Sequence, residues 1–142
     1  MTYVDSDGEK KYPTVIHRTS IGCYERTLAL LIEKHAGAMP LWLAPVQVVV
    51  APITERTHDY AQSVAKKLSD AGFRTETDSR NEKIGYKIRE AQLQKVPYMI
   101  VLGDKEAESG LITVRSRAQG DIGTMELSAF IEKLVSEQKA YK

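Results

Sequence analysis

The sequence has little that could support covalent or metal chemistry. Its 142 residues include one cysteine and three histidines, which excludes an internal disulfide framework and a zinc site built from cysteines alone. No window approaches the roughly 20 consecutive apolar residues that a membrane helix requires. The first residues are polar and lack the apolar stretch of a signal peptide. We therefore expect a cytoplasmic protein that does not cross a membrane.

An excess of charge of one sign is also missing. The chain has 20 lysines and arginines against 19 aspartates and glutamates, for a formal net charge of +1. A strongly basic balance would by itself suggest nucleic acid as a partner, and this balance does not. The hydrophobic fraction of 42% and the charged fraction of 27% are typical of a soluble globular domain with a short appendage.

Hydrophobic periodicity predicts alternating strands and helices. The nearly continuous β-branched run at 46–53 indicates a central parallel strand, because such strands are covered on both faces. Helices are expected from Ser20, and from Thr57 to about Ala71, with Ser20 and Thr57 as N-caps. The remaining elements are helices at 84–91 and 127–135, and strands at 73–77, 98–103 and 111–117.

This order predicts an α/β fold, a mixed sheet with helices on both faces. The strands on either side of the turn-rich segment 104–110 are expected to pair as an antiparallel hairpin. Near the start, residues 5–8 predict a tight turn between two short extended pieces. Two prolines mark 38–45 as a linker, packed because Leu41 to Leu43 are apolar, and we place the domain boundary after residue 44.

Two arginines in the strand at 111–117 are candidates for contact with nucleic acid. If Ile112 and Val114 face the core, Arg115 and Arg117 face outward, roughly 6–7 Å apart. A guanidinium offers a fork of donors that suits the acceptor edge of guanine, and it also stacks on bases. The alternative is an edge strand whose charges discourage aggregation, and the strand taken alone favours it.

The loop before the helix at 84–91 offers a second polar group. Asn81 can both donate and accept hydrogen bonds, as the reading of a base edge requires. Lys83 and Lys87 share a helical face and could follow a phosphate backbone. A simpler interpretation is a solvated helix start capped by Asn81. Glu108, in the predicted turn, could accept a hydrogen bond from a base, although a loop glutamate is more often merely solvated.

Residues 46–142 contain no arrangement typical of an active site. His58 is the one histidine there, and the segment has no cysteine and no glycine run of the kind that cradles a phosphate. We find no pair of carboxylates placed for general acid–base catalysis.

Four strings resemble the threonyl-tRNA synthetases of bacterial type, which are class II enzymes. They are I-H-R-x-x-x-G-x-x-E-R from residue 16, P-L-W-L-A-P-V-Q-V-V-V from 40, R-N-E-K-I-G-Y-K-I-R-E from 80 and V-P-Y-M-I-V-L-G-D-K-E from 96. The likeness extends from about Tyr3 to Val135. It implies a five-stranded, mixed, mostly parallel sheet at 45–142, the anticodon-binding domain. Residues 1–44 would be a strand–helix remnant of the catalytic domain and a linker.

The resemblance also implies a function. Members of this family activate threonine with ATP and magnesium, transfer it to tRNA, and read the G and U of the anticodon with the C-terminal domain. Positions 81–83, Glu108 and Arg117 match residues that lie against the anticodon. With Lys87 and Arg115 they form our candidate anticodon-binding set: Asn81, Lys83, Lys87, Glu108, Arg115 and Arg117.

Two further residues match the catalytic domain. Arg26 matches an arginine that contacts the ATP phosphates, and His17 matches one of the ligands of the zinc ion that holds threonine. The partners of His17, a cysteine and a histidine, are absent, and one imidazole cannot complete a zinc site. We expect a fragment that binds the anticodon stem-loop of threonine tRNA without cofactors and cannot aminoacylate. Zinc, ATP and a homodimer formed through the catalytic domain would belong to the full-length parent.

Two other functions stay open. A free-standing domain of this fold could act as an accessory or interaction module without tRNA identity. A small-ligand-binding α/β domain is the second, because loops that follow parallel strands can hold nucleotides. The missing phosphate loop argues against it.

Overall fold

The computed structural model describes residues 1–19 and 21–141, in two compact units divided at residue 30. In the first unit, β1 (Tyr3–Val4) and β2 (Lys10–Lys11) pair antiparallel, as the predicted turn between two extended pieces requires. The helix α1 (Tyr24–His35) follows. The helix start predicted at Ser20 lies outside the described residues.

The strand that the resemblance implies before α1 is not formed. Residues 12–19 are irregular and exposed. A strand is stable only beside paired neighbours, and none of the residues described in this short unit pairs with that segment.

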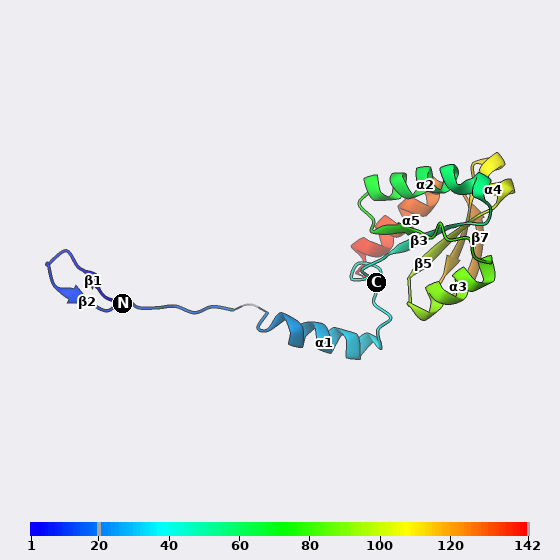
Figure 1. Cartoon of the computed structure of the whole chain (residues 1–142). Coiled ribbons are helices and arrows are strands. Elements are labelled where there is room, and N and C mark those ends of the chain that lie inside the picture. The colour runs from blue at the N-terminus through cyan, green and yellow to red at the C-terminus, as the bar shows by residue number, and fades with distance from the viewer. Residues whose placement is uncertain (20, 142) are drawn as a thin grey trace. The chain divides into compact units, whose positions relative to one another are not determined.

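The second unit is a five-stranded sheet with helices on both faces (Figure 1). Within the described residues, no helix is long and apolar enough to cross a membrane. The elements in chain order are β3 (Val48–Pro52), the 3-10 turn η1 (Glu55–Thr57), α2 (His58–Asp70), β4 (Thr75–Thr77), α3 (Ile84–Leu93), β5 (Tyr98–Leu102), α4 (Asp104–Ser109), β6 (Ile112–Ser116), β7 (Gly120–Met125) and α5 (Leu127–Lys139).

The strands lie in the order β4-β3-β5-β6-β7. β3 pairs parallel with β4 and β5, whereas β6 pairs antiparallel with both β5 and β7. The sheet therefore has a carboxyl end, where β3, β4 and β5 finish, and an amino end, where they begin. β6 starts at the carboxyl end and finishes at the amino end. This arrangement confirms the predicted mixed α/β fold and the antiparallel pairing of β5 with β6.

Side chains that alternate along the strands build a core on each face. Val48 and Val50 belong to the larger cluster, which includes Phe130 of α5 and the buried side chains of α2. Val49 belongs to the smaller cluster, which includes Ala91 of α3. Figure 1 shows α2 and α5 on one face and α3 on the other. The continuous apolar character of β3 is explained because both of its faces are covered.

Three local predictions are wrong. Segment 104–110 is not an open turn, because α4 occupies it and ends at Gly110 in the left-handed region (φ 72°). β6 is not an edge strand, because β7 pairs with its outer side. Thr57 occupies the N-cap position of α2 without capping it. Its hydroxyl donates instead to the carbonyls of Thr54 and Leu102, 2.8 and 3.3 Å away.

The linker belongs to the second unit and packs only in part, because Trp42 is exposed. Leu41 and Ala44 are buried. The buried amide of Gln47 donates to the Leu41 carbonyl over 2.8 Å, and the Arg74 guanidinium donates to the Ala44 carbonyl over 2.9 Å. The domain boundary after residue 44 stays a prediction.

Candidate nucleic-acid interface

The loop that carries Asn81 and Lys83 lies at the carboxyl end of the sheet, between β4 and α3. Both residues are exposed. Lys83, not Asn81, occupies the N-cap position of α3, and no side chain caps that helix. The simpler interpretation of Asn81 as a helix cap is therefore wrong.

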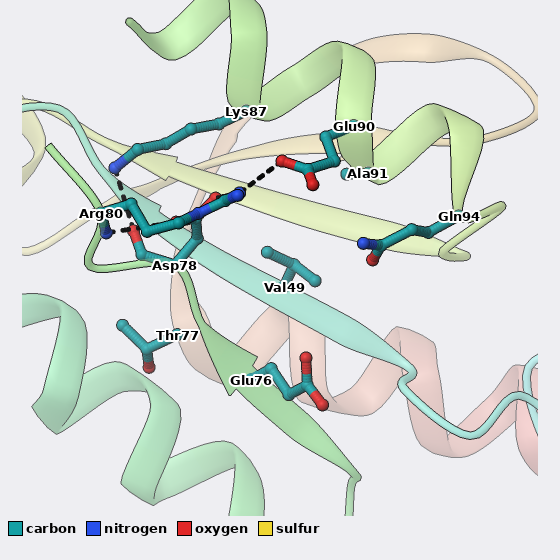
Figure 2. Close-up of a pocket in the computed structure, with 9 residues that line it drawn as sticks. All are labelled: Val49, Glu76, Thr77, Asp78, Arg80, Lys87, Glu90, Ala91 and Gln94. Atoms are coloured by element: carbon teal, nitrogen blue, oxygen red, sulfur yellow. Dashed lines mark hydrogen bonds and ion pairs between the residues drawn. The ribbon is translucent and has the colours of Figure 1, made fainter. Parts of the chain in front are cut away.

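The start of this loop is held by ion pairs around Arg80 (Figure 2). The guanidinium donates from Nε and Nη2 to the two carboxylate oxygens of Asp78, over 2.8 and 2.7 Å. Its Nη2 also donates to Glu90 Oε2 of α3, over 2.5 Å. The hydrogen bond from Arg80 lowers the pKa of the Asp78 carboxyl, and the bond to Asp78 raises the pKa of the guanidinium. The loop is therefore tied to the helix that follows it.

Lys87 does not lie on the surface, so its predicted role in following an RNA backbone is wrong. Its side chain is 3% exposed. The ammonium donates to the carbonyl of Pro52, 3.1 Å away, and to that of Asp78, 2.9 Å away. Helical spacing puts Lys83 and Lys87 on the same side of α3. Lys83 is exposed, whereas Lys87, one turn later, is buried where α3 packs against β3.

Arg115 lies on the sheet face that α3 partly covers. Ile112 and Val114 are fully buried on the opposite face, which confirms the predicted alternation. Arg115 is half-buried and donates from Nη1 to Asp121 Oδ2 of β7, over 3.2 Å.

A second cross-strand contact continues this face toward the carboxyl end. The hydroxyls of Thr113 and Thr124 lie 3.0 Å apart. With Arg115 and Asp121 they form a polar row, which we call the β6–β7 face. A neutral pair and one exposed ion pair leave this face with little net charge.

Arg117, two residues after Arg115, lies at the amino end of the sheet. It follows β6, and its guanidinium donates to the carbonyls of Lys95 and Met39, over 2.6 and 3.0 Å. Burial lowers its pKa. The structure thus does not bring Arg117 together with Asn81, since the antiparallel course of β6 carries the two to opposite ends of the sheet.

Glu108 and Glu106 both belong to α4, at the carboxyl end. Glu108 is exposed, on a helix and not in a loop. Glu106 was missed by the sequence analysis. Its Oε2 accepts from the Gly103 amide over 2.9 Å, and its Oε1 accepts from the Thr113 hydroxyl over 2.8 Å. The signal was the G-D-K-E pattern, in which the fourth residue returns to cap the helix start.

The candidate catalytic residues lie outside the sheet. His17 and Arg26 are exposed. Across the part of the chain that the structure describes, no three His, Cys, Asp or Glu residues gather where they could hold a metal ion. The described residues therefore do not by themselves form the zinc site that the resemblance implies.

Comparisons with known proteins agree with this geometry. A family model described as an anticodon binding domain matches residues 47–137. The chain is 58% identical over 137 residues to a threonine–tRNA ligase of Clostridium botulinum (strain Eklund 17B / Type B), covering 96% of this chain and 21% of that protein. It is 56% identical over 138 residues to a threonine–tRNA ligase of Xanthomonas euvesicatoria pv. vesicatoria (strain 85-10), covering 97% and 22%.

A solved structure is similar as well. It is the crystal structure of the RNA binding domain of threonyl-tRNA synthetase from Cryptosporidium parvum Iowa II. The TM-score is 0.75 and the sequence identity 36%, over 80% of this chain and 28% of that one. The chain spans about a fifth of the length of the curated relatives.

Proposed function

Because this chain belongs to the anticodon-binding domain family, we propose that it recognises the anticodon of threonine tRNA as part of a threonine–tRNA ligase. The observation that carries the proposal is the family match at 47–137, which encloses all five strands of the sheet. The specificity for threonine tRNA rests on the relatives, which are threonine–tRNA ligases at 56–58% identity.

The residues that support this function best extend from the carboxyl end of the sheet, where Asn81 and Glu108 lie, along the face of β6 to Arg115 near the amino end. Exposed Asn81 offers a donor and an acceptor to a base edge, and Lys83 beside it suits a phosphate. Arg115 on the β6–β7 face offers the fork of donors that guanine accepts. Glu108, exposed on α4, is the candidate acceptor for a base amino group. Arg117 is less well suited, because two backbone carbonyls already occupy its fork.

For the whole protein we propose the activity of its relatives: threonine is activated with ATP and magnesium and transferred to tRNA in the cytoplasm. Arg26 would contribute to the ATP site and His17 to a zinc site, each completed by residues outside this chain. A homodimer formed through the catalytic domain belongs to the same proposal.

A binding titration tests the function. The chain is mixed with the anticodon stem-loop of threonine tRNA and with a variant in which the anticodon G is replaced, at several salt concentrations. We expect the matched RNA to bind more tightly by roughly 5- to 150-fold, the range that one specific base contact supports. Affinity for both RNAs should fall steeply with salt. Equal affinity for the two RNAs would favour an accessory module without tRNA identity.

A further inference from the structure

The Arg80 side chain is half exposed, and two carboxylates bind its guanidinium. Figure 2 shows the guanidinium between Asp78 on the loop and Glu90 on α3, and all three residues line one pocket. The guanidinium donates to both carboxylate oxygens of Asp78. Its Nη2 donates to Asp78 and also to Glu90. Paired forks of this kind fix orientation as well as distance.

The same loop start is held from beneath. The Asp78 amide donates to the Val50 carbonyl over 2.9 Å, which continues the pairing of β4 with β3. The buried ammonium of Lys87 donates to the carbonyls of Asp78 and Pro52. Asp78 is thus fixed through its amide, its carbonyl and its carboxylate. Fixing Asp78 also fixes the direction of the backbone that follows it, and therefore the position of Asn81 three residues later.

The charges of this cluster cancel. Arg80 and Lys87 are cations, Asp78 and Glu90 are anions, and the four lie in one connected set of contacts. A guanidinium that two carboxylates already bind is a poor partner for a phosphate, because an RNA contact would have to break those bonds. Lys83, which is exposed beside the cluster, carries a charge that a phosphate can reach.

We propose that Arg80 is a positioning residue, which binds Asp78 and Glu90 to hold the loop 78–83 in the shape that presents Asn81 to a base. Arg80 itself does not contact RNA. This inference rests on the proposed function, since it assigns Arg80 a role in the same recognition. It deepens that function by separating the residues that touch RNA from those that aim them.

Substitution of Glu90 tests the proposal, because the two interpretations of Arg80 predict opposite results. Glu90→Met removes one anion and frees one side of the guanidinium. If Arg80 positions the loop, discrimination between the matched and G-replaced stem-loops falls roughly tenfold despite the added positive charge. If Arg80 binds phosphate, Glu90→Met tightens both RNAs equally and leaves discrimination unchanged. That second result overturns the proposal.

Two further variants sharpen the test. Arg80→Met should reduce discrimination between the two stem-loops as much as Glu90→Met does. The double variant that carries both substitutions should lose no more discrimination than either single variant, because Arg80 and Glu90 act through one contact. Lys83→Met is the matched control: it should weaken both RNAs alike and reduce the slope of log affinity against log salt by about 1. Fully additive losses in the double variant contradict the proposal.

Two readouts separate failure of the proposal from other failures. Thermal unfolding of each variant should remain cooperative, and hydrogen exchange of the amides at 79–83 should quicken in Glu90→Met while exchange in β3 and β5 is unchanged. If the unmodified chain does not discriminate between the stem-loops, the proposed function fails and takes this role with it. If the unmodified chain discriminates and Glu90→Met does so equally well, only the positioning role is overturned.

Discussion

An arginine at each end of the sheet donates to two acceptor groups, and the two arginines connect different parts of the structure. At the carboxyl end, Arg80 binds two carboxylates, and the loop beyond it leaves Asn81 exposed. At the amino end, Arg117 binds the carbonyls of Met39 and Lys95. One arginine therefore joins a loop to its helix, and the other joins the linker to the sheet. An exposed arginine can therefore stabilise the fold, and exposure alone does not show that an arginine contacts RNA.

A second side chain at the amino end contacts the segment just before the linker. The ammonium of Lys95 donates to the carbonyl of Ala36. Lys95 itself has φ 57°, in the left-handed region that favours glycine, at a cost of roughly 1–2 kcal/mol relative to an ordinary conformation. The side chain explains why a lysine occupies this helix end, because its ammonium binds the Ala36 carbonyl and a glycine has no side chain to do so.

The largest expected effect lies at the carboxyl end. Lys87→Met keeps the volume of the stem but leaves the Pro52 and Asp78 carbonyls without their donor. We expect the free energy of unfolding to fall by about 2–4 kcal/mol, since each buried acceptor left unpaired costs roughly 1–3 kcal/mol. Urea unfolding measures this loss. Lys83→Met, on the same helix side but exposed, should change stability by less than about 0.5 kcal/mol. Equal losses for the two variants would remove the distinction between them.

A smaller stability effect is expected at the amino end, and it reverses the sequence-based assignment. Arg117→Met should cost about 1–2 kcal/mol of stability, because two charge-assisted hydrogen bonds to the linker are lost. Discrimination at the anticodon should be unchanged. Stem-loop titration and urea unfolding on one protein sample measure both quantities. A loss of discrimination without a loss of stability would restore Arg117 to the reading site.

Arg115→Met should give the converse result. Its one ion pair, with Asp121, is exposed and should contribute less than about 1 kcal/mol to stability. Discrimination against the G-replaced stem-loop should fall by about 1–3 kcal/mol, as for an arginine that contacts a base. The same titration checks this result, and an unchanged preference would exclude Arg115 as the reader of G.

The sequence predicts those parts of the fold whose cause is local. β3 and β5 are recognisable because burial on both faces leaves continuous apolar runs. β7 is not, since Gly120 and Gly123 weaken its strand pattern and its pairing depends on β6. α4 is missed because its six residues have no apolar stripe, and their start depends on the bond from the Gly103 amide to Glu106.

The candidate site divides in the same way. The chemistry of Asn81, Lys83 and Arg115 can be inferred from residue type and alternation along a strand. The position of Lys87 cannot, because spacing along α3 does not say which side meets β3. The neighbours of Arg117 cannot either, since Met39 is 78 residues away in the chain.

At high pH the amino end should weaken first. Burial and the hydrogen bond to Glu137 raise the pKa of Tyr98 above its ordinary value of 10.0. The unfolded chain then loses this proton at a lower pH than the folded chain does. Stability from Tyr98 is thus complete below about pH 10 and falls as the pH rises further. Tyr98→Phe should lack this fall, so the difference in urea midpoint between the two proteins should shrink from pH 9 to pH 11. A constant difference would contradict it.

At low pH the carboxyl end should weaken, by a smaller amount because Arg80 is half exposed to solvent. The bond from Arg80 holds the pKa of Asp78 below its ordinary value of 3.8. Such a carboxyl contributes stability above the pKa of the unfolded chain and loses it as the pH falls through the folded pKa. Asp78→Asn should therefore be less stable than the unmodified chain at pH 7, and the gap should begin to narrow as the pH falls below about 3.9, the pKa of an aspartate in the unfolded chain. If the gap stays constant as the pH falls from 5 to 2, the ionised carboxylate is not what holds the loop, and the contrast between the two ends rests on the backbone bonds alone.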